Sequence, residues 1–121
     1  MNQASVDYII VGGGSAGCVL AARLSENANC QVMLIEAGGK DRNPLIHIPA
    51  GYIKTMVDPS INWMFESEAE PGTANRRIAI PRGKVLGGSS AINGMLYVRG
   101  QVDDYNGWAQ RGNPGWSYDD V

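Results

Sequence analysis

The glycine-rich hexapeptide at residues 12–17 has the residue types and the spacing of a phosphate-binding turn. It fits the G-x-G-x-x-G pattern, in which each glycine has its own steric role. Gly12 would make a tight turn, Gly14 would let the main chain approach a diphosphate, and Gly17 would let a helix pack closely on a sheet. The diphosphate would lie at a helix N-terminus, where free N–H groups favour negative charge. The residues predicted to bind a cofactor here are Gly12, Gly14, Ser15, Ala16 and Gly17.

A carboxylate completes this first motif. Glu36 lies 19 residues after Gly17, close to the spacing of about 20 at which an acidic residue meets the adenosine ribose. Its oxygens can accept hydrogen bonds from both ribose hydroxyls, and they would repel a 2′-phosphate, which argues against NADP. The motif is compatible with FAD and with NAD.

The elements around the motif predict an α/β fold with a Rossmann-like βαβ unit. The apolar run at residues 6–11 is typical of a buried parallel strand. An amphipathic helix is predicted at 15–25, with Ala16, Val19, Leu20 and Leu24 on one stripe, and a second apolar strand at 31–36. Strand, turn, helix and strand fit within about 30 residues, the size of one βαβ unit.

Regular patterns are weaker in the rest of the chain. Pro44, Pro49 and two glycines predict a loop at 37–50, and residues 68–77 form a polar linker. The other predicted elements are a helical turn or two at 51–57, strands at 62–67 and 78–80, the start of a helix at 89–95 and a helix at 102–110.

Composition narrows the function classes. The 121 residues have the length of one domain, and the net charge of −2 with interspersed charges argues against a nucleic-acid partner. Cys18 and Cys30 do not make a disulfide framework and are expected to be reduced and mostly buried. No leader-like or membrane-spanning pattern is present in these residues, so a cytoplasmic protein is predicted.

A second glycine-rich motif carries a family resemblance. Residues 81–100 read Pro-Arg-Gly-Lys-Val-Leu-Gly-Gly-Ser-Ser-Ala-Ile-Asn-Gly-Met-Leu-Tyr-Val-Arg-Gly. This stretch resembles the glucose-methanol-choline oxidoreductases, most of all their choline dehydrogenase and alcohol dehydrogenase branch. Residues 7–11, 35–38, 62–63 and 103–105 resemble the same family, so the resemblance covers essentially the whole chain.

The resemblance implies a flavin site. It implies FAD as the cofactor, with Gly88 and Ser89 near its diphosphate and ribityl chain, and with the residues at 93–96 along the isoalloxazine. Donors aimed at the flavin ring would tune the cofactor. Ile92 stands where some members of the family carry a histidine that tethers FAD, so non-covalent binding is expected. The residues that the resemblance adds to the site are Ala37, Val85, Gly88, Ser89, Asn93, Gly94, Met95 and Leu96.

The resemblance also implies a reaction, the oxidation of a primary alcohol to an aldehyde by hydride transfer to FAD, with oxygen or a quinone-type compound as the final acceptor. The family's catalytic histidine would lie outside this sequence, so no catalytic residue and no metal ligand is predicted here. His47 does not match that histidine and is interpreted as structural or cofactor-adjacent. Membrane-surface association occurs in this branch of the family.

The chain is expected to be an incomplete FAD-binding domain. The first strand should be central in its sheet, and an uncovered sheet edge invites pairing with other polypeptide. Either a missing C-terminal part or a second chain would complete it. Two alternatives stay open, a stand-alone nucleotide-binding module without catalysis and an NAD-dependent dehydrogenase that only the first motif supports. Asp103 and Asp104 are expected at a helix N-terminus, and Trp63, Trp108 and Trp116 in core or interface packing.

Overall fold

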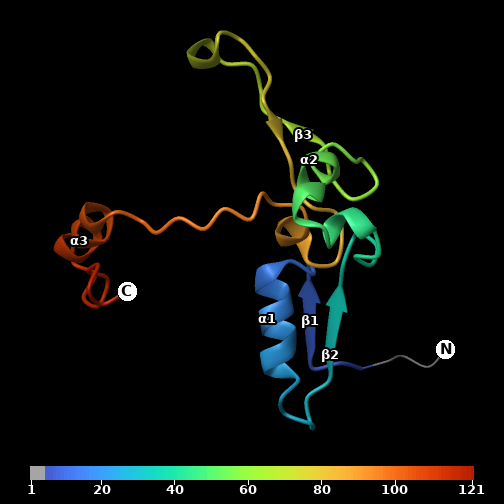
Figure 1. Cartoon of the computed structure of the whole chain (residues 1–121). Helices are drawn as coiled ribbons and strands as arrows, with labels where there is room; N and C mark the ends of the chain where they lie inside the picture. The colour runs from blue at the N-terminus through green and yellow to red at the C-terminus, as the bar shows by residue number, and fades with distance from the viewer. Residues whose placement is uncertain (1–4) are drawn as a thin grey trace.

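The computed structural model describes residues 5–121, which form three successive parts. A βαβ unit comes first, a middle region with a projecting arm follows, and a small helical unit lies at the end of an extended segment (Figure 1). Within residues 5–121, no helix is long and apolar enough to cross a membrane.

The βαβ unit confirms the predicted α/β fold. It consists of β1 (Tyr8–Val11), α1 (Ser15–Leu24) and β2 (Val32–Ile35). β1 and β2 are parallel, with Tyr8 paired to Val32 and Val11 paired to Ile35. Their β-branched and apolar side chains suit a pleated sheet that is covered on its faces. The unit brings the loops that follow both strands to one end of the sheet (Figure 1).

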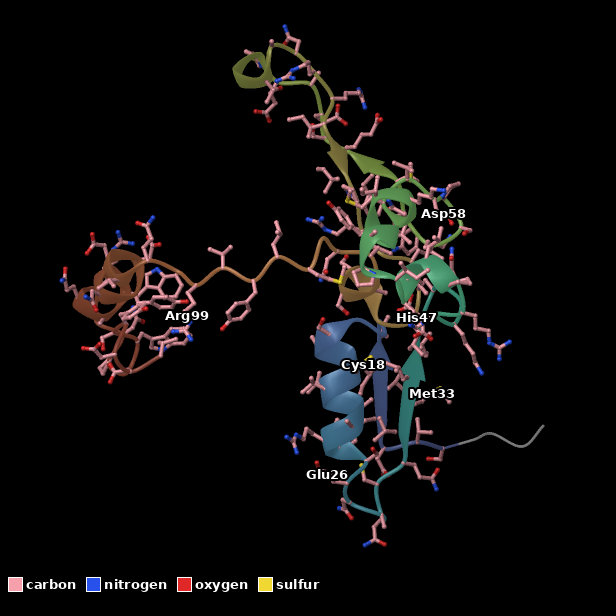
Figure 2. The ribbon with its side chains drawn as sticks, viewed as in Figure 1. Cys18, Glu26, Met33, His47, Asp58 and Arg99 are labelled. Carbon is pink, nitrogen blue, oxygen red and sulfur yellow. The ribbon has the colours of Figure 1, made fainter. Side chains whose placement is uncertain are left out.

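Only one face of this two-stranded sheet is covered. Ile10 is buried and faces α1, where it neighbours Gly17. The alternate residues Ile9 and Val11, with Met33 and Ile35 beside them on β2, point to the opposite face and are exposed. Figure 2 labels Met33 on β2.

The apolar stripe predicted on α1 is not buried in this chain. Val19 and Leu20 are more than half exposed, and Gly17 is the buried residue of the helix. The helix therefore contacts β1 through its glycine, because the absence of a side chain allows the two backbones to approach closely.

The middle region begins with short turns. The predicted loop at 37–50 contains the 3₁₀ helices η1 (Pro44–Ile46) and η2 (Pro49–Gly51), and the helical turn predicted at 51–57 is α2 (Tyr52–Thr55). Asn43 caps η1 by accepting a hydrogen bond from the Leu45 N–H at 3.0 Å.

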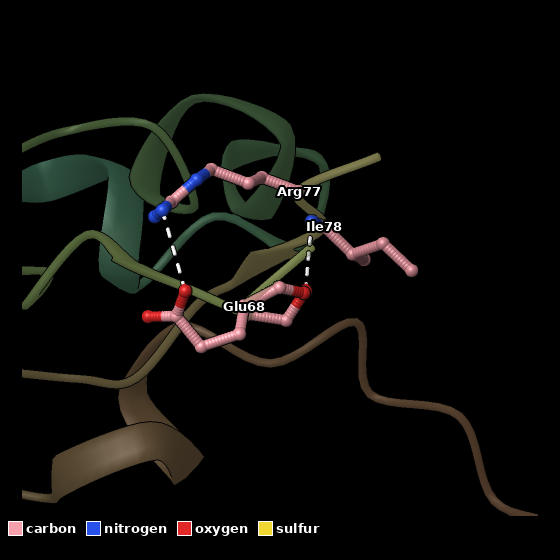
Figure 3. Close-up of polar contacts among 4 residues, drawn as sticks. Glu68, Arg77 and Ile78 are labelled. Atoms are coloured by element: carbon pink, nitrogen blue, oxygen red, sulfur yellow. Dashed lines mark hydrogen bonds and ion pairs between the residues drawn. The ribbon is translucent and has the colours of Figure 1, made fainter. Parts of the chain in front are cut away.

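The arm is a two-residue ladder with a long tip. β3 (Phe65–Glu66) pairs antiparallel with β4 (Ala79–Ile80), and the 3₁₀ helix η3 (Pro71–Thr73) lies in the tip. Beyond the ladder, Arg77 donates to Glu68 at 3.3 Å, and the Ile78 N–H donates to the Ser67 hydroxyl at 3.1 Å (Figure 3). The strand predicted at 62–67 is therefore shorter than expected.

Asn62 explains why that strand is short. It is 3% exposed, and its side chain binds three main-chain groups: it donates to the Met56 carbonyl and accepts from the N–H groups of Met64 and Arg82. The turn it makes puts Met64 at φ 55°, in the left-handed region. This conformation interrupts the extended backbone until Phe65.

The hydrophobic core lies in the middle region. It consists of Ile61, Val85 and Ile92, with Ile46 and Ala91 packed against it. Strand-like contacts join the two segments that carry Ile61 and Val85, since the Lys84 N–H donates to the Ile61 carbonyl at 2.8 Å.

The helix predicted to start at 89–95 does not form. A single 3₁₀ turn, η4 (Gly88–Ala91), is present, and the chain then runs extended to α3 (Val102–Gln110) (Figure 1). Asn93 accepts a hydrogen bond from the Met95 N–H at 2.9 Å, and Met95 has φ 53°. This Asx turn competes with helix formation.

The helix predicted at 102–110 is confirmed as α3, with Asp103 and Asp104 in its first turn. There they complement the positive end of the helix dipole. Tyr105 packs on Trp108 with ring centroids 5.3 Å apart, and Trp108 packs on Trp116 at 5.8 Å.

The tryptophans do not lie in the core. Trp63, Trp108 and Trp116 are each about half exposed and pack in surface aromatic pairs, so the core alternative is not found and the interface alternative stays a prediction. The prediction that both cysteines are mostly buried is wrong. Cys18 and Cys30 are unpaired but only partly buried. Cys18, labelled in Figure 2, donates its thiol hydrogen to the Gly13 carbonyl at 3.2 Å.

The ionisation of Asp58 makes the stability of the middle region depend on pH in the acid range. The Ser60 hydroxyl and main-chain N–H both donate to its carboxylate, and they hold the pKa of Asp58 below its ordinary value of 3.8. A lowered folded-state pKa stabilises the fold above the unfolded-state pKa, and this stabilisation is lost as pH falls through the folded-state value.

We expect Ser60→Ala to raise the pKa of Asp58 and shift acid unfolding to higher pH. NMR titration of the carboxyl carbon tests this, with Ser25→Ala, which removes an exposed hydroxyl bonded to Ala22, as the control. An unchanged Asp58 titration in Ser60→Ala would contradict it.

Candidate nucleotide-binding site

The two glycine-rich motifs meet at the end of β1. Gly12 has φ 102° and makes the turn out of the strand, as predicted. The next residue, Gly13, accepts a hydrogen bond through its carbonyl from the Gly87 N–H at 2.7 Å. The second motif therefore closes directly over the first.

The two loops also pack against each other at Gly14 and Gly88. Gly88 has φ 58°, and a Cβ atom on it would lie 2.8 Å from the Cα of Gly14. No larger residue fits at position 88 without moving one of the loops. A Cβ atom on Gly14, by contrast, would have no neighbour closer than 3.9 Å, so the outer face of Gly14 stays open to a ligand.

The N-terminus of α1 points into this region with uncapped N–H groups. The first turn of a helix has no internal acceptors for these groups, and Gly14 at the N-cap supplies no side chain to accept from them. Ser15 and Ala16 are exposed, and the first turn contains no acidic residue. The arrangement suits an anion such as a phosphate.

Gly17 is required by the packing of α1. A Cβ atom at this position would overlap the carbonyl oxygen of Gly12 and approach Ile10. The predicted role of Gly17 in close helix–sheet packing is thus visible in the structure.

Glu36 clamps the first loop to the end of β2. Its two carboxylate oxygens accept hydrogen bonds from the N–H of Gly13 at 2.6 Å and from the N–H of Gly38 at 2.8 Å. A carboxylate has about four acceptor sites, so two bonds leave capacity for ribose hydroxyls. The exposed Ala37 lies beside it in the chain. The ribose contact itself stays a prediction.

The segment after Glu36 is hydrogen-bonded to the second loop. Gly39 bridges to Val85, and the Leu86 N–H donates to the Gly39 carbonyl at 2.8 Å. A Cβ atom on Gly38 would overlap the carbonyl group of Lys84. Sequence reasoning did not assign this role to Gly38, although the glycine pair 38–39 directly after a predicted site residue was a usable signal.

Hydroxyl groups hold the second loop in shape. The Gly83 N–H donates to the Ser89 oxygen at 3.1 Å, and the Ser90 hydroxyl donates to the Gly87 carbonyl at 2.6 Å. Ser89 is exposed and retains its own hydroxyl hydrogen for another acceptor. Val85 is fully buried in the core, and its predicted contact with a cofactor stays a prediction.

The predicted residues at 93–96 belong to the start of the extended segment. Gly94 lies near the ring of Tyr52, while Asn93, Met95 and Leu96 are exposed. Met95 adopts its left-handed conformation here, which costs of order 1 kcal/mol or more and tends to occur at functional sites. The first motif, Glu36 and residues 87–89 are thus gathered around one end of the sheet, and 93–96 follow from them.

No acid–base pair accompanies these loops in the described part of the chain. His47 is exposed, and its Nε2 atom lies 2.6 Å from the Asp41 carbonyl and 3.8 Å from the Asp41 carboxylate. Residues 5–121 contain no group of three potential metal ligands. The geometry supports holding an anionic nucleotide.

Comparisons with known proteins agree over nearly all of the chain. Residues 6–121 match the family model described as GMC oxidoreductase. An oxygen-dependent choline dehydrogenase of Rhizobium etli (strain CIAT 652) is 53% identical over 115 residues, which cover 95% of this chain and 21% of that protein. The corresponding enzyme of Vibrio vulnificus (strain YJ016) is 52% identical over 116 residues, 96% of this chain and 21% of the relative.

Solved structures have a similar backbone over nearly all of this chain. Pyridoxine 4-oxidase from Mesorbium loti superimposes with a TM-score of 0.81 at 42% identity, over 96% of this chain and 23% of the oxidase. A formate oxidase of Aspergillus oryzae RIB40, studied for modification of its FAD, superimposes with a TM-score of 0.80 at 31% identity, over 99% of this chain and 21% of the oxidase. The chain spans about one fifth of the length of the curated relatives it matches.

Proposed function

This chain belongs to the GMC oxidoreductase family, which residues 6–121 match, and on that premise we propose that it is the FAD-binding segment of a flavin-dependent alcohol oxidoreductase. The complete enzyme oxidises the CH–OH group of a primary alcohol to an aldehyde, with FAD accepting the hydride. The family resemblance inferred from residues 81–100 is confirmed by the match. Choline dehydrogenase and pyridoxine oxidase among the relatives support an alcohol as the substrate class.

The observation that carries the proposal is the meeting of two glycine loops over one helix N-terminus. The first loop alone would suit NAD or FAD. The second loop packs against the first at Gly14 and Gly88. It continues into residues 93–96, whose exposed backbone could contact the flavin ring. A nicotinamide site needs no such second loop, which favours FAD.

The residues present fit FAD. The uncapped N–H groups of α1 and the side-chain-free surface of Gly14 suit its diphosphate. Glu36 has free acceptor capacity for the adenosine ribose, and Ser89 has a hydroxyl hydrogen to donate. Asn93, Gly94, Met95 and Leu96 are proposed to lie along the flavin ring.

Binding is proposed to be non-covalent. Position 92 holds isoleucine, whose side chain is buried in the core with Ile61 and Val85. It therefore offers neither a nucleophilic atom nor access to a ligand.

The proton-accepting groups are proposed to lie in polypeptide outside these residues, either a continuation of this chain or a second polypeptide. Within residues 5–121, His47 is the histidine present. Its ring is exposed and lies against the main-chain carbonyl of Asp41. A cytoplasmic location remains a prediction.

The proposal is tested by incubating the purified chain with FAD, desalting it and recording its visible spectrum. The expected result is that the chain retains a flavin spectrum and that excess NAD does not displace the bound flavin. Displacement by NAD would favour the nicotinamide alternative. A chain that is folded by circular dichroism yet retains no flavin would overturn the proposal.

Glu36 provides a more specific prediction. In Glu36→Gln one of the two amide N–H groups now bound by carboxylate oxygens faces an NH₂ donor, and the charge that attracts ribose hydroxyls is lost. We expect FAD affinity to fall about tenfold or more, equivalent to about 1.4 kcal/mol. Flavin fluorescence titration measures it. Glu26→Gln, which removes an exposed partner of Arg23, is the control and should bind FAD normally. Equal affinities of the two variants would count against a role for Glu36.

A further inference from the structure

Gly13 stands at a position of the first motif that the G-x-G-x-x-G pattern leaves open to any residue. It is nevertheless buried, and both of its main-chain groups are bonded. Its N–H donates to Glu36 Oε2 at 2.6 Å. Its carbonyl accepts from the Gly87 N–H at 2.7 Å and from the Cys18 thiol at 3.2 Å. Gly13 therefore joins the first loop to the second loop and to the end of β2.

The side chain of Leu86 borders Gly13. A Cβ atom on Gly13 would lie 3.0 Å from Leu86 Cδ1 and 3.3 Å from both Cβ and Oε2 of Glu36. Oε2 is the oxygen that accepts from the Gly13 N–H. The leucine methyl group and the carboxylate thus lie next to the same side of Gly13, the side on which a side chain would stand. An apolar group of the second loop is therefore placed beside the hydrogen bond between Glu36 and Gly13.

The main chain holds Leu86 in this place. Its N–H donates to the Gly39 carbonyl at 2.8 Å, and the next residue, Gly87, donates to Gly13. The residue before it, Val85, is fully buried in the core. The Leu86 side chain itself is 36% exposed. It lies outside the core on a backbone that is fixed on both sides, so its removal leaves the core packing in place.

We propose that Leu86 is a positioning residue for the adenosine end of the nucleotide. Its side chain keeps water from the hydrogen bond between Glu36 and Gly13, and so holds the carboxylate in the orientation that accepts from the ribose hydroxyls. The inference rests on the proposed function through the ribose contact of Glu36, and it gives a residue of the second loop a role in binding the adenosine. FAD and NAD share that end, so the role of Leu86 can be tested separately from the choice of cofactor.

The physical reason is competition with water. The hydrogen bond from the Gly13 N–H to the Glu36 carboxylate is charge-assisted, and such a bond is stronger where water is excluded. Glu36 is only partly buried, so a methyl group beside it limits how much water reaches its oxygens. Without Leu86, a ribose hydroxyl would have to displace water from a carboxylate that is held less firmly.

The test compares the binding of ADP and of 2′-deoxy-ADP, which lacks one of the two ribose hydroxyls. Isothermal titration calorimetry measures both affinities for the purified chain. The unmodified chain should prefer ADP about tenfold, the worth of one hydrogen bond to a charged group. Leu86→Ala should lower the affinity for ADP about fivefold or more and remove most of this preference. A purely structural loss would weaken both nucleotides by the same factor and leave the preference unchanged.

Leu20→Ala is the matched control, because it makes the same change at a residue that is 52% exposed and lies on α1 beyond its first turn. It should leave the preference for ADP unchanged. Leu86→Met keeps an apolar side chain of similar volume and should restore the preference. Circular dichroism checks that the three variants keep the helix content of the unmodified chain.

Amide hydrogen exchange gives a second measurement that needs no variant. Adenosine carries neither phosphate nor flavin, so it does not itself cover the second loop. If its ribose fixes Glu36, then Gly13 is fixed as well, and exchange of the Gly87 N–H that donates to Gly13 should slow about fivefold or more. 2′-Deoxyadenosine should slow this exchange less.

The inference is overturned if Leu86→Ala leaves the preference for ADP unchanged, if Leu20→Ala removes it equally, or if the chain binds no ADP. Should Leu86→Ala fail to fold, unchanged exchange of the Gly87 N–H in the presence of adenosine overturns it. FAD retention is measured separately. A chain that retains no FAD but loses its preference for ADP in Leu86→Ala would contradict the proposed function and support the role of Leu86. Retained FAD with an unchanged preference would do the reverse.

Discussion

Replacement of Gly17 by alanine is expected to abolish flavin retention and to destabilise the chain by about 3 kcal/mol. The added methyl group would overlap the Gly12 carbonyl, which belongs to the backbone of the turn and cannot rotate away. To relieve the overlap, α1 must move off β1. That movement displaces the N–H groups of its first turn and opens the contact between Gly14 and Gly88. Thermal unfolding and flavin titration measure the two effects.

Gly107→Ala is the matched control, because Gly107 also lies inside a helix. A Cβ atom at position 107 has no neighbour within 4 Å. Alanine should stabilise an unhindered helical position by about 0.5–1 kcal/mol. Destabilisation of both variants to the same extent would show that helix geometry in general, and not the approach of α1 to Gly12, governs the result.

Replacement of Asn62 by alanine is expected to cost about 3 kcal/mol and to weaken flavin binding, although Asn62 belongs to neither glycine motif. Three main-chain groups lose their partner, and a buried group left without a hydrogen bond costs about 1–3 kcal/mol. The segment from Arg82 then loses its anchor, and Gly83 to Gly88 follow directly from it. Urea unfolding gives the stability and fluorescence titration gives the affinity.

Asn93→Ala provides the comparison for stability. Asn93 makes the same kind of turn, with its side chain accepting from the Met95 N–H at 2.9 Å, but it is exposed. Water can replace the lost bond, so the stability change should stay within about 0.5 kcal/mol. If Asn62→Ala were as mild, the buried hydrogen bonds of Asn62 would not be what holds the second loop.

The local elements could be predicted because their signals lie within a few residues. The apolar run before Gly12, the glycine spacing and the carboxylate at position 36 together predicted β1, α1 and β2. The helix at 102–110 could be predicted because acidic residues lie in its first turn and Gly112 follows its end, and the structure confirms it. Several glycines of the two motifs are required by the fold: Gly12, Gly87 and Gly88 have positive φ, and a Cβ atom on Gly17 or Gly83 would overlap backbone atoms. Cofactor binding by these motifs stays a prediction.

Long-range pairing could not be predicted in the same way. The clamp of Glu36 on Gly13, the approach of Gly38 to Lys84 and the three bonds of Asn62 join residues that the sequence separates by 20 or more positions in most cases. The helix expected at 89–95 failed because an Asx turn at Asn93 competes with it. The stripe on α1 is exposed here because amphipathic spacing determines which residues share a face, not what covers that face.

The hydrogen bond from Gly87 to Gly13 has a consequence for the order of folding. The two residues are 74 positions apart, whereas the contacts of β1, α1 and β2 close within about 30 residues. Long loops close more slowly and at higher entropic cost than short ones. During synthesis the first glycine loop therefore emerges and folds against α1 well before its cover exists. We expect the cofactor site to be the last feature of this region to mature, so that nascent chains hold a formed helix terminus before they can retain a nucleotide.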